Sequence, residues 1–236
     1  DIDEAKFIVD EIKMLHREGV PLNHIAILYR SNAQSRVLEH NIFSSNLPYR
    51  VYGGLRFFER AEIKHAIAYL RLIANKNDDS AFLRIVNFPT RGIGSRSLES
   101  LQDISRRDNC SLWDAAQKSS DHAPAIKKGL PYFIHLIKHI ESGFEGLTLP
   151  QMIDLIINES GLKNHYTNEK DGLDRVSNLN ELVSAAATFL NNDNNESLNP
   201  LGDFLNYSSL ESGDMQASEG SDAIQLMTIH SSKGLE

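Results

Sequence analysis

The side chains most clearly suited to chemistry stand near the end of the chain, directly after an apolar run. Residues 224–227 predict a buried strand, and Thr228, His230 and Lys233 follow it in a segment of small residues. In open α/β folds, ligands bind at the carboxyl ends of the strands. The segment therefore predicts a ligand-binding edge of a sheet. The alternative is an ordinary strand that ends in a turn at Gly234.

A second group of polar residues stands near the amino terminus, where a predicted strand (residues 24–29) runs into a helix. Three polar residues lie in this strand-to-helix turn or just after it: Arg30, Asn32 and Arg36. Helix N-terminal amides carry partial positive charge, so together with two guanidiniums they make the turn suited to an anion. Helix capping by Ser31 or Asn32 is the alternative for those two residues. Arg36 is equally suited to an ion pair within its own domain.

A third group is a glycine-containing loop that precedes a predicted helix. Its bare backbone amides allow close approach, and the helix N-terminus adds partial positive charge. Two arginines complete a clamp that would hold phosphate without reading bases. A Gly-x-Gly by itself more often marks a tight turn. The residues assigned to this clamp are Thr90, Arg91, Gly92, Ile93, Gly94, Ser95 and Arg96.

The elements that must position these groups are of two kinds. Up to residue 52, predicted helices and strands alternate as in α/β folds, whereas from residue 62 to about 210 every predicted element is helical. The acidic segment 211–222, rich in Ser and Gly, predicts a linker. Because a strand follows it, the helical block is predicted to be an insertion into a sheet domain built by both chain ends. Gly53 and Gly54, which permit positive φ, suit a pivot between the two parts.

Composition bounds the class of protein. The 236 residues, 41% of them hydrophobic, are enough for a sizeable core. No apolar run approaches the roughly 18 to 20 residues of a membrane helix, and the amino-terminal residues are acidic where a signal peptide is basic. We therefore expect a soluble, cytoplasmic protein with no membrane partner.

Disulfide and metal sites are not predicted. Cys110 is the single cysteine, which excludes an internal disulfide and a four-thiolate zinc site. His135 and His139 have the i, i+4 spacing of a metal-binding pair, but no acidic or cysteine partner accompanies them. We interpret both as solvent-facing or interfacial histidines.

The net charge of −8 argues against a nucleic-acid partner until its distribution is considered. Residues 191–222 hold seven acidic and no basic residues, whereas residues 84–107 hold five arginines against Glu99 and Asp103. A local basic face can grip phosphate on a protein that is acidic overall. The charge pattern is therefore compatible with DNA binding by the helical block.

Four segments, in order along the chain, resemble motifs of the UvrD/Rep/PcrA group of superfamily 1 DNA helicases. Residues 29–36 read YRSNAQSR, residues 53–64 read GGLRFFERAEIK, residues 90–94 read TRGIG, and residues 226–236 read LMTIHSSKGLE. The last segment resembles helicase motif V. The resemblance extends over essentially the whole chain.

The resemblance implies an α/β fold with a large all-α insertion. Residues 1–61 and 218–236 would form part of a RecA-like parallel-sheet subdomain, 2A, and residues 62–217 would form a helical subdomain, 2B, with a helix-hairpin-helix-like element. The TRGIG segment would face duplex DNA, and Gly53 and Gly54 would lie in the first hinge. The residues that the resemblance assigns to single-stranded DNA are Arg30, Asn32, Arg36, Thr228 and His230.

The resemblance also assigns Glu236 to the ribose of ATP, with Gly234 and Lys233 beside it. The sequence contains no phosphate loop, no DExx-type magnesium motif and no downstream arginine motif. We therefore expect a fragment with no catalytic residue and no cofactor of its own. The parent protein would use ATP and Mg²⁺.

By this resemblance the parent is an ATP-dependent helicase that moves 3′ to 5′ and serves DNA repair. Its partners would be single-stranded DNA, the duplex junction, and repair proteins that contact 2B. The alternative is a non-catalytic module that docks DNA or protein.

Overall fold

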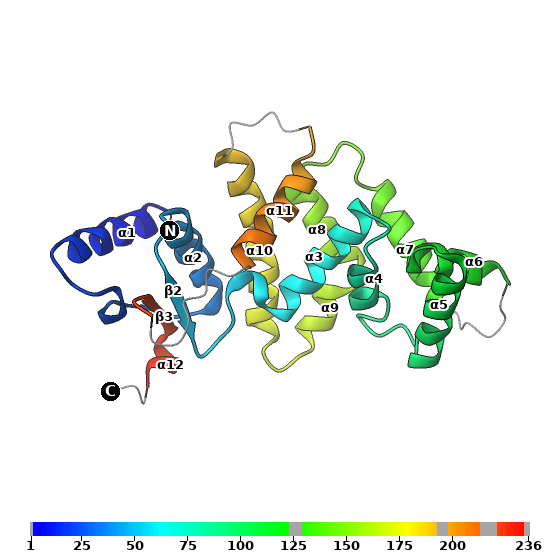
Figure 1. Cartoon of the computed structure of the whole chain (residues 1–236), viewed down its shortest axis with the longest axis horizontal. Coiled ribbons are helices and arrows are strands. Elements are labelled where there is room, and N and C mark those ends of the chain that lie inside the picture. The colour runs from blue at the N-terminus through cyan, green and yellow to red at the C-terminus, as the bar shows by residue number, and fades with distance from the viewer. Residues whose placement is uncertain (1, 123–128, 193–197, 213–220, 234–236) are drawn as a thin grey trace. The chain divides into compact units, whose positions relative to one another are not determined.

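The computed structural model describes residues 2–122, 129–192, 198–212 and 221–233. Their contacts divide the chain into two compact units (Figure 1). Unit 1 comprises Asp1–Arg60 and Asn206–Glu236, and unit 2 comprises Ala61–Leu205. Among the described helices, none is both long and apolar enough to cross a bilayer.

Unit 1 is built on a three-stranded parallel sheet. Its strands are β1 (Ala26–Tyr29), β2 (Tyr49–Tyr52) and β3 (Ile224–Thr228), in the order β1-β3-β2. The strand from the carboxyl-terminal segment lies in the middle, where it pairs with both others. The sheet therefore requires segments about 200 residues apart in the sequence. The prediction of a small sheet built by both chain ends, with a large helical part between them, is confirmed.

Two helices and the sheet make the core of unit 1. Helix α1 (Ile2–Arg17) buries Ala5, Val9 and Ile12, which lie on one face at helical spacing. Helix α2 (Ser35–Ser44) adds Ile42, which is fully buried. The shorter elements of this unit are the 3-10 turns Leu22–His24, Asn32–Gln34 and Phe57–Glu59 and helix α12 (Ile229–Ser232).

Every regular element that the structure describes in unit 2 is a helix. This unit contains α3 (Ala61–Ala74), α4 (Asp79–Ile85), α5 (Ser95–Asp108), α6 (Leu112–His122), α7 (Gly129–Ser142), α8 (Leu149–Glu159), α9 (Leu162–Thr167) and α10 (Gly172–Asn192). Helix α3 packs against α4, α8, α9 and α10, so it is the central helix. Its buried residues, among them Ile63, Tyr69 and Leu70, are apolar except for Glu62 and lie on several faces of the helix. Burial of apolar residues on several faces is typical of a helix in a domain core.

Helix α11 (Pro200–Ser212) crosses from unit 2 to unit 1. The sequence predicted a linker from residue 211, but Glu211 belongs to this helix and is 7% exposed. Its carboxylate accepts a hydrogen bond from the Tyr207 hydroxyl and pairs with His40 Nδ1 at 2.8 Å. These partners explain why an acidic residue can end a packed helix here. The predicted domain boundary at residue 217 lies outside the described residues.

Candidate nucleic-acid interface

The carboxyl edge of the sheet gathers polar residues from three distant segments. Because all three strands are parallel, their carboxyl ends lie at one edge. Tyr29 lies opposite Thr228, and Tyr52 lies opposite Met227. The residues at the ends of the strands and just beyond them therefore share this edge, which we call the sheet edge: Arg30, Gly53, Thr228 and His230.

Arg30 is an open cation of the sheet edge. Its side chain is exposed and has no hydrogen-bond or ion-pair partner among the described residues. The turn's own amides are occupied, because Gln34 Oε1 accepts from the backbone N–H groups of Arg30 at 3.1 Å and Ser31 at 3.2 Å. Gln34 therefore caps this turn, whereas the N-cap residue Ser31 makes no side-chain capping hydrogen bond. An anion at this turn would meet the guanidinium of Arg30 rather than these amides.

Asn32 and Arg36 are less open. The Asn32 carbonyl accepts from Arg60 Nη1 at 2.8 Å and lies 3.0 Å from the Ser35 hydroxyl. Arg36 is only 5% exposed. Its burial favours the intradomain interpretation over a contact with DNA, because a guanidinium must reach solvent to meet phosphate.

A buried polar network holds the turn after β1 against the segment after β2. Arg60 Nη2 donates to the Ser35 hydroxyl at 2.6 Å, and that hydroxyl donates to Glu39 at 2.5 Å. Glu39 also accepts from the Phe57 amide at 3.0 Å and lies 3.6 Å from Arg60. Burial raises the pKa of Glu39, while the charge of Arg60 acts in the opposite direction. The network fixes the position of Asn32 through its carbonyl.

At the end of β3, Thr228 caps helix α12. Its Oγ1 accepts from the Ser231 amide at 3.1 Å and lies 2.9 Å from the Ser231 hydroxyl. His230 and Lys233 are exposed. Thr228 therefore positions this short helix, and His230 and Lys233 are the polar residues of the segment that face solvent.

Gly53 allows α12 to approach the end of β2. Its φ is +71°, and a Cβ there would collide with the Ser231 hydroxyl. A Cβ on Gly54 would lie 3.9 Å from Asn32 Oδ1. Close packing at the sheet edge thus explains why position 53 needs a residue without a Cβ. A pivot at Gly53 and Gly54 stays a prediction.

In unit 2, one of the two arginines predicted to clamp phosphate, Arg91, is turned inward. Arg91 Nη1 donates to the carbonyls of Ile85 at 3.0 Å and Pro89 at 3.1 Å, and Nη2 donates to the Tyr69 hydroxyl at 2.6 Å and the Ser160 carbonyl at 3.1 Å. These four acceptors occupy the guanidinium. We therefore assign Arg91 to shaping the loop and not to contacting phosphate.

The backbone of the same loop is organised by Asn87. Its side-chain oxygen accepts from the amides of Arg91 at 2.8 Å and Ile93 at 3.1 Å. Gly92 has φ +73°, and Ile93 is 4% exposed, which anchors the loop in the core of unit 2. A Cβ on Gly129 would collide with the Arg91 carbonyl, so α7 begins directly against the loop.

The solvent side of the loop carries the predicted contacts that remain open. Thr90, Gly92, Gly94, Ser95 and Arg96 are exposed. Gly94 is the N-cap of α5, and the first amides of a helix have no partner within it. Arg96 has no polar partner among the described residues. This exposed set, which we call the α5 tip, combines one free guanidinium with a helix N-terminus.

Two of the predicted ATP contacts, Gly234 and Glu236, lie outside the described residues. Lys233 is exposed at the end of α12. Within the described ranges, no group of three or more His, Cys, Asp or Glu is arranged to hold a metal ion. His135 and His139 are exposed, and their rings lie 6.4 Å apart.

Comparison with known proteins identifies the family. The UvrD-like helicase C-terminal domain matches residues 1–236. The chain belongs to this family. It is 47% identical over its whole length to DNA helicase II of Escherichia coli strain K12 and 44% identical to that of Haemophilus influenzae. It is 36% identical over 99% of its length to ATP-dependent DNA helicase PcrA of Staphylococcus epidermidis.

The chain spans about a third of the length of these relatives, covering 34%, 33% and 32% of them respectively. The predicted resemblance to UvrD-like helicases is thus confirmed at the level of the family.

Sequence reasoning missed the residues that position the site. Glu39, Arg60, Asn87 and Ser231 make the buried or capping contacts described above. Three of the four form at least one of these contacts with a residue more than five positions away, which no local pattern encodes. The signal available for Arg60 was its place in the GGLRFFER segment, of which it is the last residue.

Proposed function

We propose that this chain is the DNA-contacting part of an ATP-dependent helicase that moves 3′ to 5′ along single-stranded DNA and serves DNA repair. The observation that carries the proposal is the sheet edge, which presents Arg30 and His230 to solvent in a member of the UvrD-like family. A guanidinium neutralises phosphate, and an imidazole offers a ring face and a polar nitrogen to a base or a phosphate. Contacts of this kind hold a strand without selecting its sequence, as translocation requires.

Unit 2 would hold the duplex through the α5 tip. Arg96 supplies a positive charge, and the N-terminus of α5 supplies amides and partial positive charge for a phosphate oxygen. Neither group reads a base edge. Binding should therefore be independent of sequence and should weaken as salt rises.

ATP and Mg²⁺ would act in the parent protein. This chain would contribute Lys233, Gly234 and Glu236, with Glu236 at the ribose. The β- and γ-phosphates and Mg²⁺ need a phosphate loop and a magnesium motif, and this sequence contains neither. We therefore expect the chain alone neither to hydrolyse ATP nor to unwind DNA.

The alternative function is a non-catalytic module that docks DNA or protein. Two polypeptides separate the possibilities: the product of the whole reading frame, and residues 1–236 alone. ATP hydrolysis with and without single-stranded DNA, and displacement of a strand from duplexes with a 3′ or a 5′ overhang, would be measured for both.

The helicase proposal predicts DNA-stimulated hydrolysis and unwinding from a 3′ overhang by the long polypeptide, and neither activity by residues 1–236. A long polypeptide that is folded and binds DNA but hydrolyses no ATP would favour the docking module. Hydrolysis by the purified short chain would contradict the assignment of the phosphate-binding groups to another part of the protein.

A further inference from the structure

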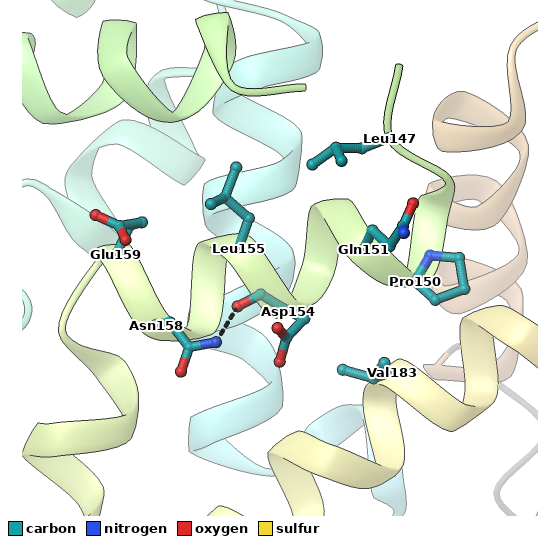
Figure 2. A pocket seen from close by; sticks show the side chains of 8 residues that line it. All are labelled: Leu147, Pro150, Gln151, Asp154, Leu155, Asn158, Glu159 and Val183. Carbon is teal, nitrogen blue, oxygen red and sulfur yellow. Dashed lines mark hydrogen bonds between the residues drawn. The ribbon is translucent and has the colours of Figure 1, made fainter. Parts of the chain in front are cut away.

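A surface groove of about 470 Å³ runs along the solvent side of α8 in unit 2 (Figure 2). Its volume lies in the range of pockets that bind ligands. One wall comes from the segment that leads into α8, and the opposite wall comes from α10. The residues that line this α8 groove are Leu147, Pro150, Gln151, Asp154, Leu155, Asn158, Glu159 and Val183.

The floor of the α8 groove is apolar although it faces solvent. Leu147, Leu155 and Val183 are half-buried. Leu155 is supported from the end of α7, because a Cβ on Gly143 would lie 2.9 Å from its Cδ2. The inward face of α8 is already filled by other apolar residues, including Ile153. Apolar side chains on a second, outward face of α8 are not part of the buried core. Such a face is typical of an interaction surface.

The rim of the groove is acidic. Two carboxylates, those of Asp154 and Glu159, line it, and one ammonium is near it, since Lys163 Nζ donates to Asn158 Oδ1 at 3.5 Å. Glu159 lies 4.0 Å from His139.

Asp154 has no ion-pair partner among the described residues. In Figure 2 its side chain lies on the side of α8 toward Val183, next to Asn158. A negative rim repels phosphates and anionic lipid headgroups and attracts cations.

We propose that the α8 groove binds a basic amphipathic segment of a partner protein, with an apolar side chain on Leu155 and Val183 and a Lys or Arg on Asp154. Apolar contact would supply most of the affinity, and the charge pair would set orientation and association rate. The groove would thus bind a positively charged partner, whereas the α5 tip would bind the negatively charged phosphates of DNA. This inference does not depend on helicase activity.

The probe is a fluorescein-labelled helical peptide of about 14 residues, with leucines on one face and lysines on the other. A second peptide carries glutamates in place of the lysines. Binding to residues 1–236 would be followed by fluorescence anisotropy, and methyl NMR shifts of Leu155 and Val183 would locate the bound peptide. The variants are Asp154→Lys and, as a matched control, Glu145→Lys, which reverses an exposed charge outside the groove.

We expect the lysine peptide to bind, to shift the two methyl signals, and to bind roughly fivefold more weakly to Asp154→Lys, with less than a twofold change for Glu145→Lys. Thermal unfolding of both variants should match that of the unmodified chain. Equal weakening by the two variants would show general charge attraction and overturn the proposal. So would equal binding of the glutamate peptide, unshifted methyl signals, or no binding at all.

Discussion

Separate alanine substitutions at Arg96 and Arg91 should give two different phenotypes, although both arginines belong to the phosphate clamp predicted from the sequence. Arg96 is exposed at the α5 tip without a polar partner among the described residues. Arg91 donates to four internal acceptors. Loss of Arg96 should therefore weaken duplex binding, and loss of Arg91 should destabilise unit 2.

The magnitudes follow from these contacts. One phosphate contact contributes about 0.9 to the slope of log K against log salt, so Arg96→Ala should flatten the slope by about one and weaken binding about eightfold at about 0.1 M salt. Arg91→Ala leaves three carbonyls and one hydroxyl without their donor. Because hydrogen bonds to charged groups contribute about 1.5 to 3 kcal/mol each and are not additive, we expect a loss of at least about 3 kcal/mol of folding free energy.

The assay is fluorescence anisotropy of two unrelated labelled duplexes at several salt concentrations, alongside thermal unfolding. Arg106→Ala is the matched control, because Arg106 is exposed near the other end of α5 and pairs with Asp103 at 3.5 Å. Arg96→Lys should retain most of the binding, whereas Arg91→Lys should remain unstable because an ammonium cannot serve four spread acceptors. The reasoning is refuted if Arg91→Ala keeps its melting temperature and flattens the salt slope, or if Arg96→Ala binds both duplexes normally.

Three further outcomes follow from the structure. Arg30→Ala should weaken single-stranded DNA binding and flatten its salt slope by about 0.7. Gly53→Ala should cost at least about 1 to 2 kcal/mol, because it adds left-handed backbone strain to a collision with Ser231. His65 is stacked on an aromatic ring, and burial, together with nearby positive groups, lowers its pKa from 6.5 to about 4. As pH falls, His65 is therefore protonated in the unfolded chain before it is protonated in the folded chain, and the free energy of unfolding decreases between about pH 6.5 and 4. The decrease is at most about 3 kcal/mol, and about half of that once the partial exposure of His65 is allowed for. His65→Phe should reduce the fall in melting temperature between pH 7 and pH 5.

Each of these outcomes has its own comparison. Arg17→Ala removes an exposed arginine that precedes β1. If it weakened binding of single-stranded DNA as much as Arg30→Ala does, Arg30 would not be a specific DNA contact. Gly19 has φ +97°, but no atom lies within 4 Å of a Cβ added there, so Gly19→Ala tests the backbone strain alone. Equal losses of folding free energy in Gly19→Ala and Gly53→Ala would argue against the collision with Ser231. An unchanged pH dependence in His65→Phe would show that other groups govern acid sensitivity.

Local patterns in the sequence predicted the elements and several of their ends. The apolar runs that became β1 and β3 were recognisable because a buried parallel strand needs only a few consecutive apolar residues. The positive φ of Gly53, +71°, was recognisable for a similar reason, since glycine lacks the Cβ that disfavours this backbone region. The extent of α11 was not recognisable, because Glu211 is held by His40, 171 residues earlier in the chain.

The sequence alone determined that the chain builds a small sheet from its two ends, carries a helical block between them, and resembles the UvrD-like family, since these follow from local periodicity and motif order. Only the tertiary structure decided which arginines are open to a ligand. Arg30 and Arg96 are exposed, whereas Arg36 is buried and Arg91 is held in part by the carbonyl of Ser160, 69 residues away. An arginine has the same charge in every setting, and its availability depends on acceptors that folding brings to it from distant segments.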